Sequence, residues 1–174
     1  GYPGPRSTSR NLHEIPARVA FHDVPKEPWT LEGATLTSAL VMHPGPTVGF
    51  RIEADGASVA YIPDHEPALT GNFAARSRDW ISGASLSGDA DLLLHDAQFF
   101  EDEYAVRIGW GHSSVDSAVA YANAVGARRL GLFHHDPGHE DRLLEQLEVE
   151  AASLTDERSE PPVLAREGMV LDLS

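Results

Sequence analysis

The segment Asp-Leu-Leu-Leu-His-Asp at residues 91–96 decides the fold class of this chain. Its short, continuous apolar run is typical of a strand that is covered on both faces of a sheet. Further along the chain, helical patterns at 113–126 and 139–154 alternate with strand patterns at 129–133 and 168–173. This alternation of strands and helices predicts a layered α/β fold.

The first half of the chain has a different pattern. Strand candidates at 35–43, 47–54 and 58–62 follow one another closely. The dipeptide Asp55-Gly56, between the last two, is a strong signal for a two-residue hairpin turn. We therefore expect antiparallel hairpins in the first half and a mixed sheet overall.

Composition and charge exclude several classes of protein. The 174 residues carry 13 Lys+Arg against 27 Asp+Glu, a net charge of −14, which argues against a broad basic surface for nucleic-acid phosphates. A nucleic-acid substrate held at a metal stays open, because bound cations would supply the positive charge. The chain has no cysteine, so disulfides, thiolate zinc sites and cysteine nucleophiles are excluded. No apolar run approaches the roughly 20 residues that cross a bilayer, so we expect a cytoplasmic protein without membrane contact.

The chain has nine histidines beside a single lysine, and several of them follow strand candidates. Ligands gather at the carboxyl ends of strands in layered α/β folds, and imidazole and carboxylate groups suit zinc and similar ions. One histidine at a strand end is more often a loop residue or a cap, but several at one edge favour a metal site. His13, His22 and His139 lack this setting and are expected to be solvated. The polar clusters at strand ends are His43, Asp64-His65, His95-Asp96 and His134-His135-Asp136.

These clusters carry a resemblance to the metallo-β-lactamase-fold hydrolases, in particular to tRNA 3′-processing endonucleases and phosphodiesterases. The similar stretches occur in the family's order. The resemblance implies the C-terminal half of an αββα fold, with a mixed sheet and helices on its outer face. It extends from residue 43 to about residue 147, through segments 42–52, 60–67, 89–99, 111–114 and 132–137.

The resemblance implies a centre of two divalent metal ions, with zinc the first expectation and manganese the second. His43 would bind one ion, His134 would bind the other, and Asp64 would bridge them. His135 stays an alternative to His134, because the strand register before it is uncertain by one residue. Two such cations lower the pKa of a bridging water, so that hydroxide exists near neutral pH.

The resemblance also implies residues that act on the substrate. His112 would contact the scissile phosphate and protonate the leaving oxygen, and Asp96 would orient His112. His65 and His95 would then lie behind the ligands or at the rim of the site. Taken alone, Gly111-His112-Ser113-Ser114 is equally consistent with a helix cap, in which Ser113 pairs with Asp116 as a capping box.

The family's most specific motif, His-x-His-x-Asp-His, is absent from these 174 residues. We therefore expect residues 1–24 to be a loop or arm and residues 25–174 to be the C-terminal half of the domain. The missing half would come from a longer protein or from a second chain; alternatively the chain is a natural truncation that assembles as a dimer. A homo-oligomer is expected. An apolar face would be exposed where that half packs.

Three functions are compatible with this pattern. The leading hypothesis is a metal-dependent hydrolase that cleaves a small-molecule or nucleotide-type phosphodiester and is complete only with the missing half. The alternative is a non-catalytic remnant of the fold that dimerises or binds a partner. A lactonase or thioester hydrolase would use the same ligands.

Overall fold

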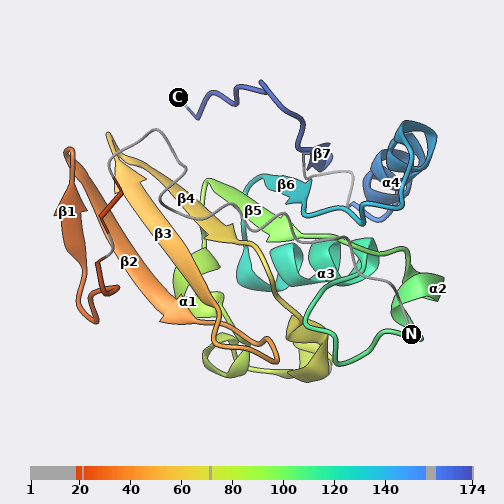
Figure 1. Cartoon of the computed structure of the whole chain (residues 1–174), viewed down its shortest axis with the longest axis horizontal. Coiled ribbons are helices and arrows are strands. Elements are labelled where there is room, and N and C mark those ends of the chain that lie inside the picture. Colours follow the sequence, from red (N-terminus) through yellow and green to blue (C-terminus); the bar gives the residue numbers. More distant parts are fainter. Residues whose placement is uncertain (1–18, 21, 71, 156–159, 174) are drawn as a thin grey trace.

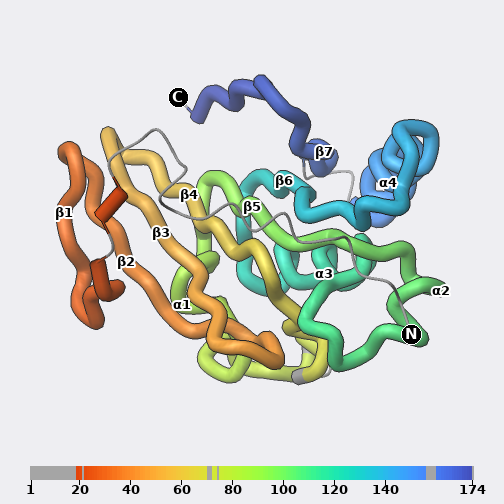
Figure 2. The backbone as a smooth tube through the Cα atoms, viewed as in Figure 1, coloured from red at the N-terminus to blue at the C-terminus, as the bar shows by residue number. Residues whose placement is uncertain are grey.

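One mixed sheet organises the molecule. The computed structural model describes residues 19–20, 22–70, 72–155 and 160–173. In this part of the chain seven strands form a single sheet, in the order β1 to β7 (Figure 1). Spatial order equals chain order, so the colour in Figure 2 runs from red to blue across the sheet. The expected α/β class and mixed sheet are confirmed.

The first four strands pair antiparallel, as the hairpin pattern predicts. Asp55 and Gly56 have φ values of 51° and 82°, the left-handed backbone that the favoured two-residue hairpin turn requires. The first strand, with three residues, was too short for the sequence pattern to reveal. The four strands are β1 Trp29–Leu31, β2 Ala34–Leu40, β3 Val48–Ala54 and β4 Ala57–Ile62.

The last strands run parallel to β4. They are β5 Leu92–Asp96, β6 Leu130–Phe133 and β7 Val163–Leu164. Because β4, β5 and β6 point the same way, the residues that follow them meet at one edge of the sheet. The expected strand at 168–173 is wrong. Val170 is 90% exposed there, so its side chain is not drawn into the core.

The helices cover one face and one end of the sheet (Figure 1). No helix among the described residues is both long and apolar enough to cross a membrane. Short 3-10 turns occur at Pro67–Thr70, Phe73–Ala75 and Arg78–Trp80. The α-helices are α1 Ala84–Ser87, α2 Glu101–Tyr104, α3 Val115–Val125 and α4 Asp141–Ser153.

Helix α3 begins and ends close to the predicted residues. Its N-cap is Ser114, whose side chain accepts from the Ser117 N–H at 3.1 Å, and Gly126 ends it with φ 74°. The expected cap by Ser113 is wrong. The Ser113 hydroxyl donates instead to the carbonyl oxygen of His65 at 2.7 Å and ties the start of α3 to the end of β4.

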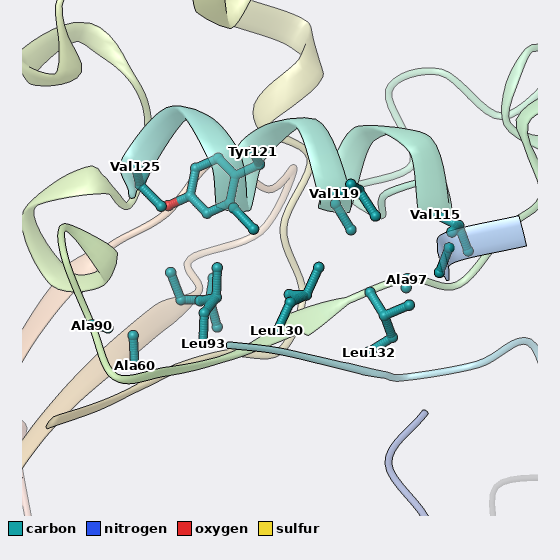
Figure 3. Packing of buried hydrophobic residues seen from close by; sticks show 14 of the residues in the cluster. Ala60, Ala90, Leu93, Ala97, Val115, Val119, Tyr121, Val125, Leu130 and Leu132 are labelled. Carbon is teal, nitrogen blue, oxygen red and sulfur yellow. The ribbon is translucent and has the colours of Figure 1, made fainter. Parts of the chain in front are cut away.

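The core lies between α3 and the sheet. Figure 3 shows Val119 and Tyr121 of α3 above Ala60, Leu93 and Leu130 of the strands. Side chains alternate along a strand, so the residues between these point to the opposite face. That face carries aromatic side chains: the rings of Tyr61 and Phe133 lie 5.3 Å apart, and Tyr61 is 36% exposed.

Two histidines complete the core beneath the edge of the sheet. His65 and His95 are both fully buried, and their rings contact Tyr121. The His95 Nδ1–H donates to the carbonyl of Asp96 at 2.7 Å, so His95 Nε2 accepts from His65 Nδ1–H at 2.8 Å. His65 Nε2 in turn accepts from the Ser82 hydroxyl at 3.0 Å. Every ring nitrogen therefore has a partner while both rings are neutral, and neither histidine lies at a rim.

Burial keeps both rings neutral. It lowers the pKa of His65, with a further contribution from His95, and lowers the pKa of His95 to about 4. An ordinary histidine takes up its proton near pH 6.5. In mild acid, below about pH 6.5, His65 and His95 therefore stay neutral in the folded chain, whereas they bind protons in the unfolded chain.

We predict that truncation of Leu93 destabilises the fold strongly. Leu93 is fully buried in β5, an interior strand of the sheet, so Leu93→Ala should lower the free energy of unfolding by about 2–5 kcal/mol. Val149 on α4 is 72% exposed, and Val149→Ala should change the same quantity by about 0.5 kcal/mol or less. Urea unfolding measures both; equal losses would contradict this description of the core.

We also predict a stability loss in mild acid that depends on His95. Its folded pKa lies below the unfolded value, so stability is full above pH 6.5 and falls as the pH drops towards 4. At pH 5 the loss from His95 alone should be about 2 kcal/mol. His95→Gln should remove that part of the fall between pH 7 and pH 5, whereas His22→Gln, at an exposed position, should not. An identical fall in the wild-type chain and the His95 variant would refute the assignment.

Candidate metal centre

Four polar side chains converge at the edge where the parallel strands end. Asp64 follows β4, Asp96 ends β5, His134 follows β6, and His112 lies just before α3. Each offers one ligand atom, and these four atoms all lie within 4.8 Å of one another. The strand-end pattern predicts that Asp64, Asp96 and His134 lie at this edge, whereas the place of His112 is implied by the family resemblance.

The spacing of Asp64 and His134 fits a metal ion. Asp64 Oδ1 lies 3.3 Å from His134 Nε2. Two tetrahedral zinc ligands with bonds of about 2.0–2.1 Å stand about 3.3 Å apart. Both side chains are about one third exposed, so an ion could reach them. The donor set therefore fits the divalent metal that the sequence predicts.

Asp96 holds His112 in a fixed orientation. Asp96 is fully buried, and its Oδ2 accepts from His112 Nδ1–H at 2.6 Å. This bond leaves Nε2 as the free nitrogen of the His112 ring. The His112 ring stacks on the His134 ring, and the two ring centroids are 4.9 Å apart. The geometry is that of a histidine oriented by a carboxylate. The catalytic roles of His112 and Asp96 stay predictions.

The electrostatics of this pair follow from burial. Burial raises the pKa of Asp96, and the adjacent His112 opposes that rise. Burial lowers the pKa of His112, but the hydrogen bond and charge of Asp96, with Asp64 and Glu66, outweigh it, so the pKa of His112 lies above its ordinary value. His112 therefore holds a proton more readily than a free imidazole.

His43 lies beside the four-residue cluster and not within it. Its ring contacts the His112 ring edge to face, with centroids 5.7 Å apart. Its Nδ1 lies 3.1 Å from the Gly45 N–H and 2.9 Å from the Thr47 hydroxyl, which leaves Nε2 as the nitrogen available to a metal. A role for His43 as a ligand stays a prediction.

The structure separates the two neighbouring histidines. His134 joins the cluster and has φ 62°, a left-handed conformation that is uncommon for a residue with a side chain. His135 does not join it, and its ring nitrogens are buried without a hydrogen-bond partner among the described residues. Burial lowers the pKa of His135. His134 is therefore the better candidate of the two.

The expectation that His139 is solvated is wrong, whereas His22 is exposed and His13 lies outside the described residues. The side chain of His139 is 5% exposed, and its Nε2 lies 3.0 Å from a carboxylate oxygen of Glu103 in α2. The ring also contacts Phe100, with centroids 5.4 Å apart. Helix α2 folds over this histidine, a contact between segments that no local pattern could reveal.

Sequence reasoning missed Glu66, which lies two residues after Asp64. A lone glutamate normally predicts a solvated side chain, yet Glu66 is fully buried. Its carboxylate accepts from the N–H groups of Gly109 and Gly111, both at 2.7 Å, in the segment before His112. The available signal was its place in the polar cluster after β4.

Comparisons with solved structures agree with this architecture. The metallo-β-lactamase fold protein YhfI from Bacillus subtilis is 23% identical in sequence and superposes with a TM-score of 0.60. The match covers 87% of this chain and 54% of YhfI. Human tRNase Z, short form, is 20% identical, with coverages of 84% and 44% and a TM-score of 0.57. At these identities the likeness establishes the metallo-β-lactamase fold.

Sequence relatives extend the comparison. A putative ribonuclease Z from Mycobacterium tuberculosis (strain CDC 1551 / Oshkosh) is 31% identical over 146 residues, which cover 72% of this chain and 60% of that protein. This chain spans about half the length of the curated relatives it matches. The family model described as the beta-lactamase superfamily domain matches residues 5–135. With the converging aspartates and histidines at the strand ends, this match shows that the chain belongs to the beta-lactamase superfamily of metallo-β-lactamase-fold proteins.

Proposed function

We propose that this chain is part of a metal-dependent hydrolase that cleaves phosphodiester bonds in a nucleic-acid substrate. The observation that carries the proposal is the convergence of Asp64, Asp96, His112 and His134 at one edge of the sheet. Ribonuclease Z relatives that are 31% identical support the substrate class. A non-catalytic remnant would have no need to retain this geometry, so that alternative is not favoured.

Asp64 and His134 would hold the metal, because their ligand atoms already stand at the spacing of two ligands of one ion. His43 would add an imidazole from the end of β2. Zinc is the first expectation and manganese the second. When bound, a divalent ion supplies Lewis-acid polarisation of the phosphoryl oxygen and lowers the pKa of a coordinated water.

His112 would act on the leaving group. Its pKa is raised, and its Nδ1–H is held by Asp96, so the ring is fixed with Nε2 free. A protonated Nε2 placed beside the scissile bond would donate its proton to the departing oxygen. Asp96 would keep the ring in this orientation and stabilise its charge.

A pair of ions needs more ligands than these residues supply. We infer that the remaining ligands come from a further polypeptide segment, in the same protein or in a second chain. Two observations support this inference. The chain spans about half the length of its curated relatives. In the described part of the chain, no helix covers the sheet face that carries Phe50, Tyr61 and Phe133. A second layer on that face would bury the partly exposed Tyr61.

The net charge of −14 bears on how a substrate binds. So acidic a chain offers little general attraction for a polyphosphate, so affinity would come from the metal ions and from positive charge outside this chain. We therefore expect a short nucleotide-type phosphodiester to suffice as a substrate for assays. A cytoplasmic, oligomeric protein stays a prediction.

We predict zinc binding that depends on the cluster. Calorimetric titration of the metal-free chain with zinc should give binding at least about tenfold tighter than that of the Asp64→Asn/His134→Ala double variant, because two converging ligands are lost. His43→Ala should have an intermediate affinity. His22→Ala, at an exposed position, is the matched control and should bind like the wild type. Equal zinc affinity in the wild type and the double variant would contradict the proposed metal site.

We predict hydrolysis of bis(p-nitrophenyl) phosphate by the zinc-loaded chain, or by the chain completed with its second segment. His112→Ala and Asp96→Asn should each lower kcat by about 10²–10⁴-fold, because both remove oriented proton donation. KM should change little in Asp96→Asn, because Asp96 is assigned no contact with the substrate, whereas His112→Ala should also raise KM, because His112 is expected to contact the scissile phosphate. Turnover of a lactone or thioester, without turnover of the phosphodiester, would replace the proposed substrate class.

A further inference from the structure

Glu66 is a buried carboxylate that the proposed mechanism uses neither as a metal ligand nor as a proton donor. Glu66 is fully inaccessible to solvent. Oε1 accepts from the Tyr104 hydroxyl at 2.9 Å and from the Gly109 N–H at 2.7 Å, and Oε2 accepts from the Gly111 N–H at 2.7 Å. A buried carboxylate is costly unless its lone pairs are satisfied, and here three donors satisfy them.

The three donors belong to one short segment, residues 104–111, which connects α2 to His112. Tyr104 is buried, at 7% exposure, but beyond it apolar packing does little to hold this segment, because Val106, Ile108 and Trp110 are 78%, 59% and 58% exposed. Within the segment the Arg107 guanidinium lies 4.9 Å over the Phe99 ring. The strong contacts between its backbone and the end of β4 are the two that Glu66 accepts.

The clamped segment lies directly against the candidate metal centre. Gly111 has φ 96°, a conformation that favours glycine, and a Cβ built there would overlap the His43 ring and Pro44. The backbone of Gly111 is therefore the surface against which His43 rests. The next residue is His112, whose ring contacts both His43 and His134.

We infer that Glu66 is a positioning residue, whose buried carboxylate clamps Gly109 and Gly111 and thereby fixes the rings of His43 and His112 relative to Asp64. The functional part of this inference rests on the proposed function; the positional part does not. The carboxylate itself is needed. An amide in its place would present an NH₂ group to one of the two N–H donors, where it cannot accept a hydrogen bond.

The test compares Glu66→Gln with the wild-type chain by NMR, without metal or substrate. The amides of Gly109 and Gly111 should exchange with solvent at least about tenfold faster in the variant, and the ring signals of His43 and His112 should shift. Amides of α3 and the ring of His22 should be unchanged. Glu148→Gln is the matched control, because it makes the same substitution at an exposed ion pair with Arg166.

A second variant keeps the inference testable if Glu66→Gln fails to fold. Gly111→Ala leaves the carboxylate in place but pushes a methyl group into His43 and Pro44, so it should shift the same two ring signals. In a zinc-loaded assay with bis(p-nitrophenyl) phosphate, Glu66→Gln should lower kcat by about tenfold or more and leave KM within about twofold. Unchanged exchange at Gly109 and Gly111 in a folded Glu66→Gln chain would overturn the clamp. If neither the wild-type chain nor any variant hydrolyses the phosphodiester, the result counts against the proposed function. The NMR comparison then decides by itself whether Glu66 positions the two rings.

Discussion

The carboxylate of Asp96 is the constraint on which the rest of the site depends. It is fully buried at the end of β5 and accepts hydrogen bonds from His112 Nδ1 at 2.6 Å, the N–H groups of Gln98 and Ser113 at 3.1 Å, and the N–H of His65 at 3.4 Å. These donors come from the ends of β4 and β5 and from the start of α3. A buried anion demands such donors, so the charge that orients His112 also holds these segments together.

Parallel strand order explains why a chain of this length assembles a site at all. Strands β4, β5 and β6 end at the same edge, and each delivers polar side chains to it. Behind that edge the neutral pair His65–His95 supports the strand ends from within the core, and Glu66 fixes the neighbouring segment. The side chains that face the metal position are the partly exposed ones, whereas those that support them are fully buried.

Sequence patterns could predict the parts of this arrangement that follow from local chemistry. The apolar run before His95, the Asp55-Gly56 turn and the helical spacing after Ser114 each specify their own element, and strand-end polarity predicts the convergence of Asp64 and His134. Burial by distant segments leaves no local mark. For that reason His139 is predicted to be solvated although its side chain is buried, and the burial of Glu66 is not predicted at all. The strand expected at 168–173 pairs with no other strand among the described residues. The sequence pattern alone could likewise not decide between His134 and His135. A shift of one residue in the strand register exchanges the directions in which successive side chains point.

We propose that this edge of the sheet binds a divalent metal through Asp64 and His134 while Asp96 orients His112. Crystals of the chain soaked in zinc, with diffraction data collected at the zinc absorption edge, test it most directly. We expect an anomalous peak within bonding distance of Asp64 Oδ1 and His134 Nε2, with the hydrogen bond between Asp96 and His112 intact. Zinc bound elsewhere, or a His112 ring turned away from Asp96 to ligate the ion through Nδ1, would contradict it.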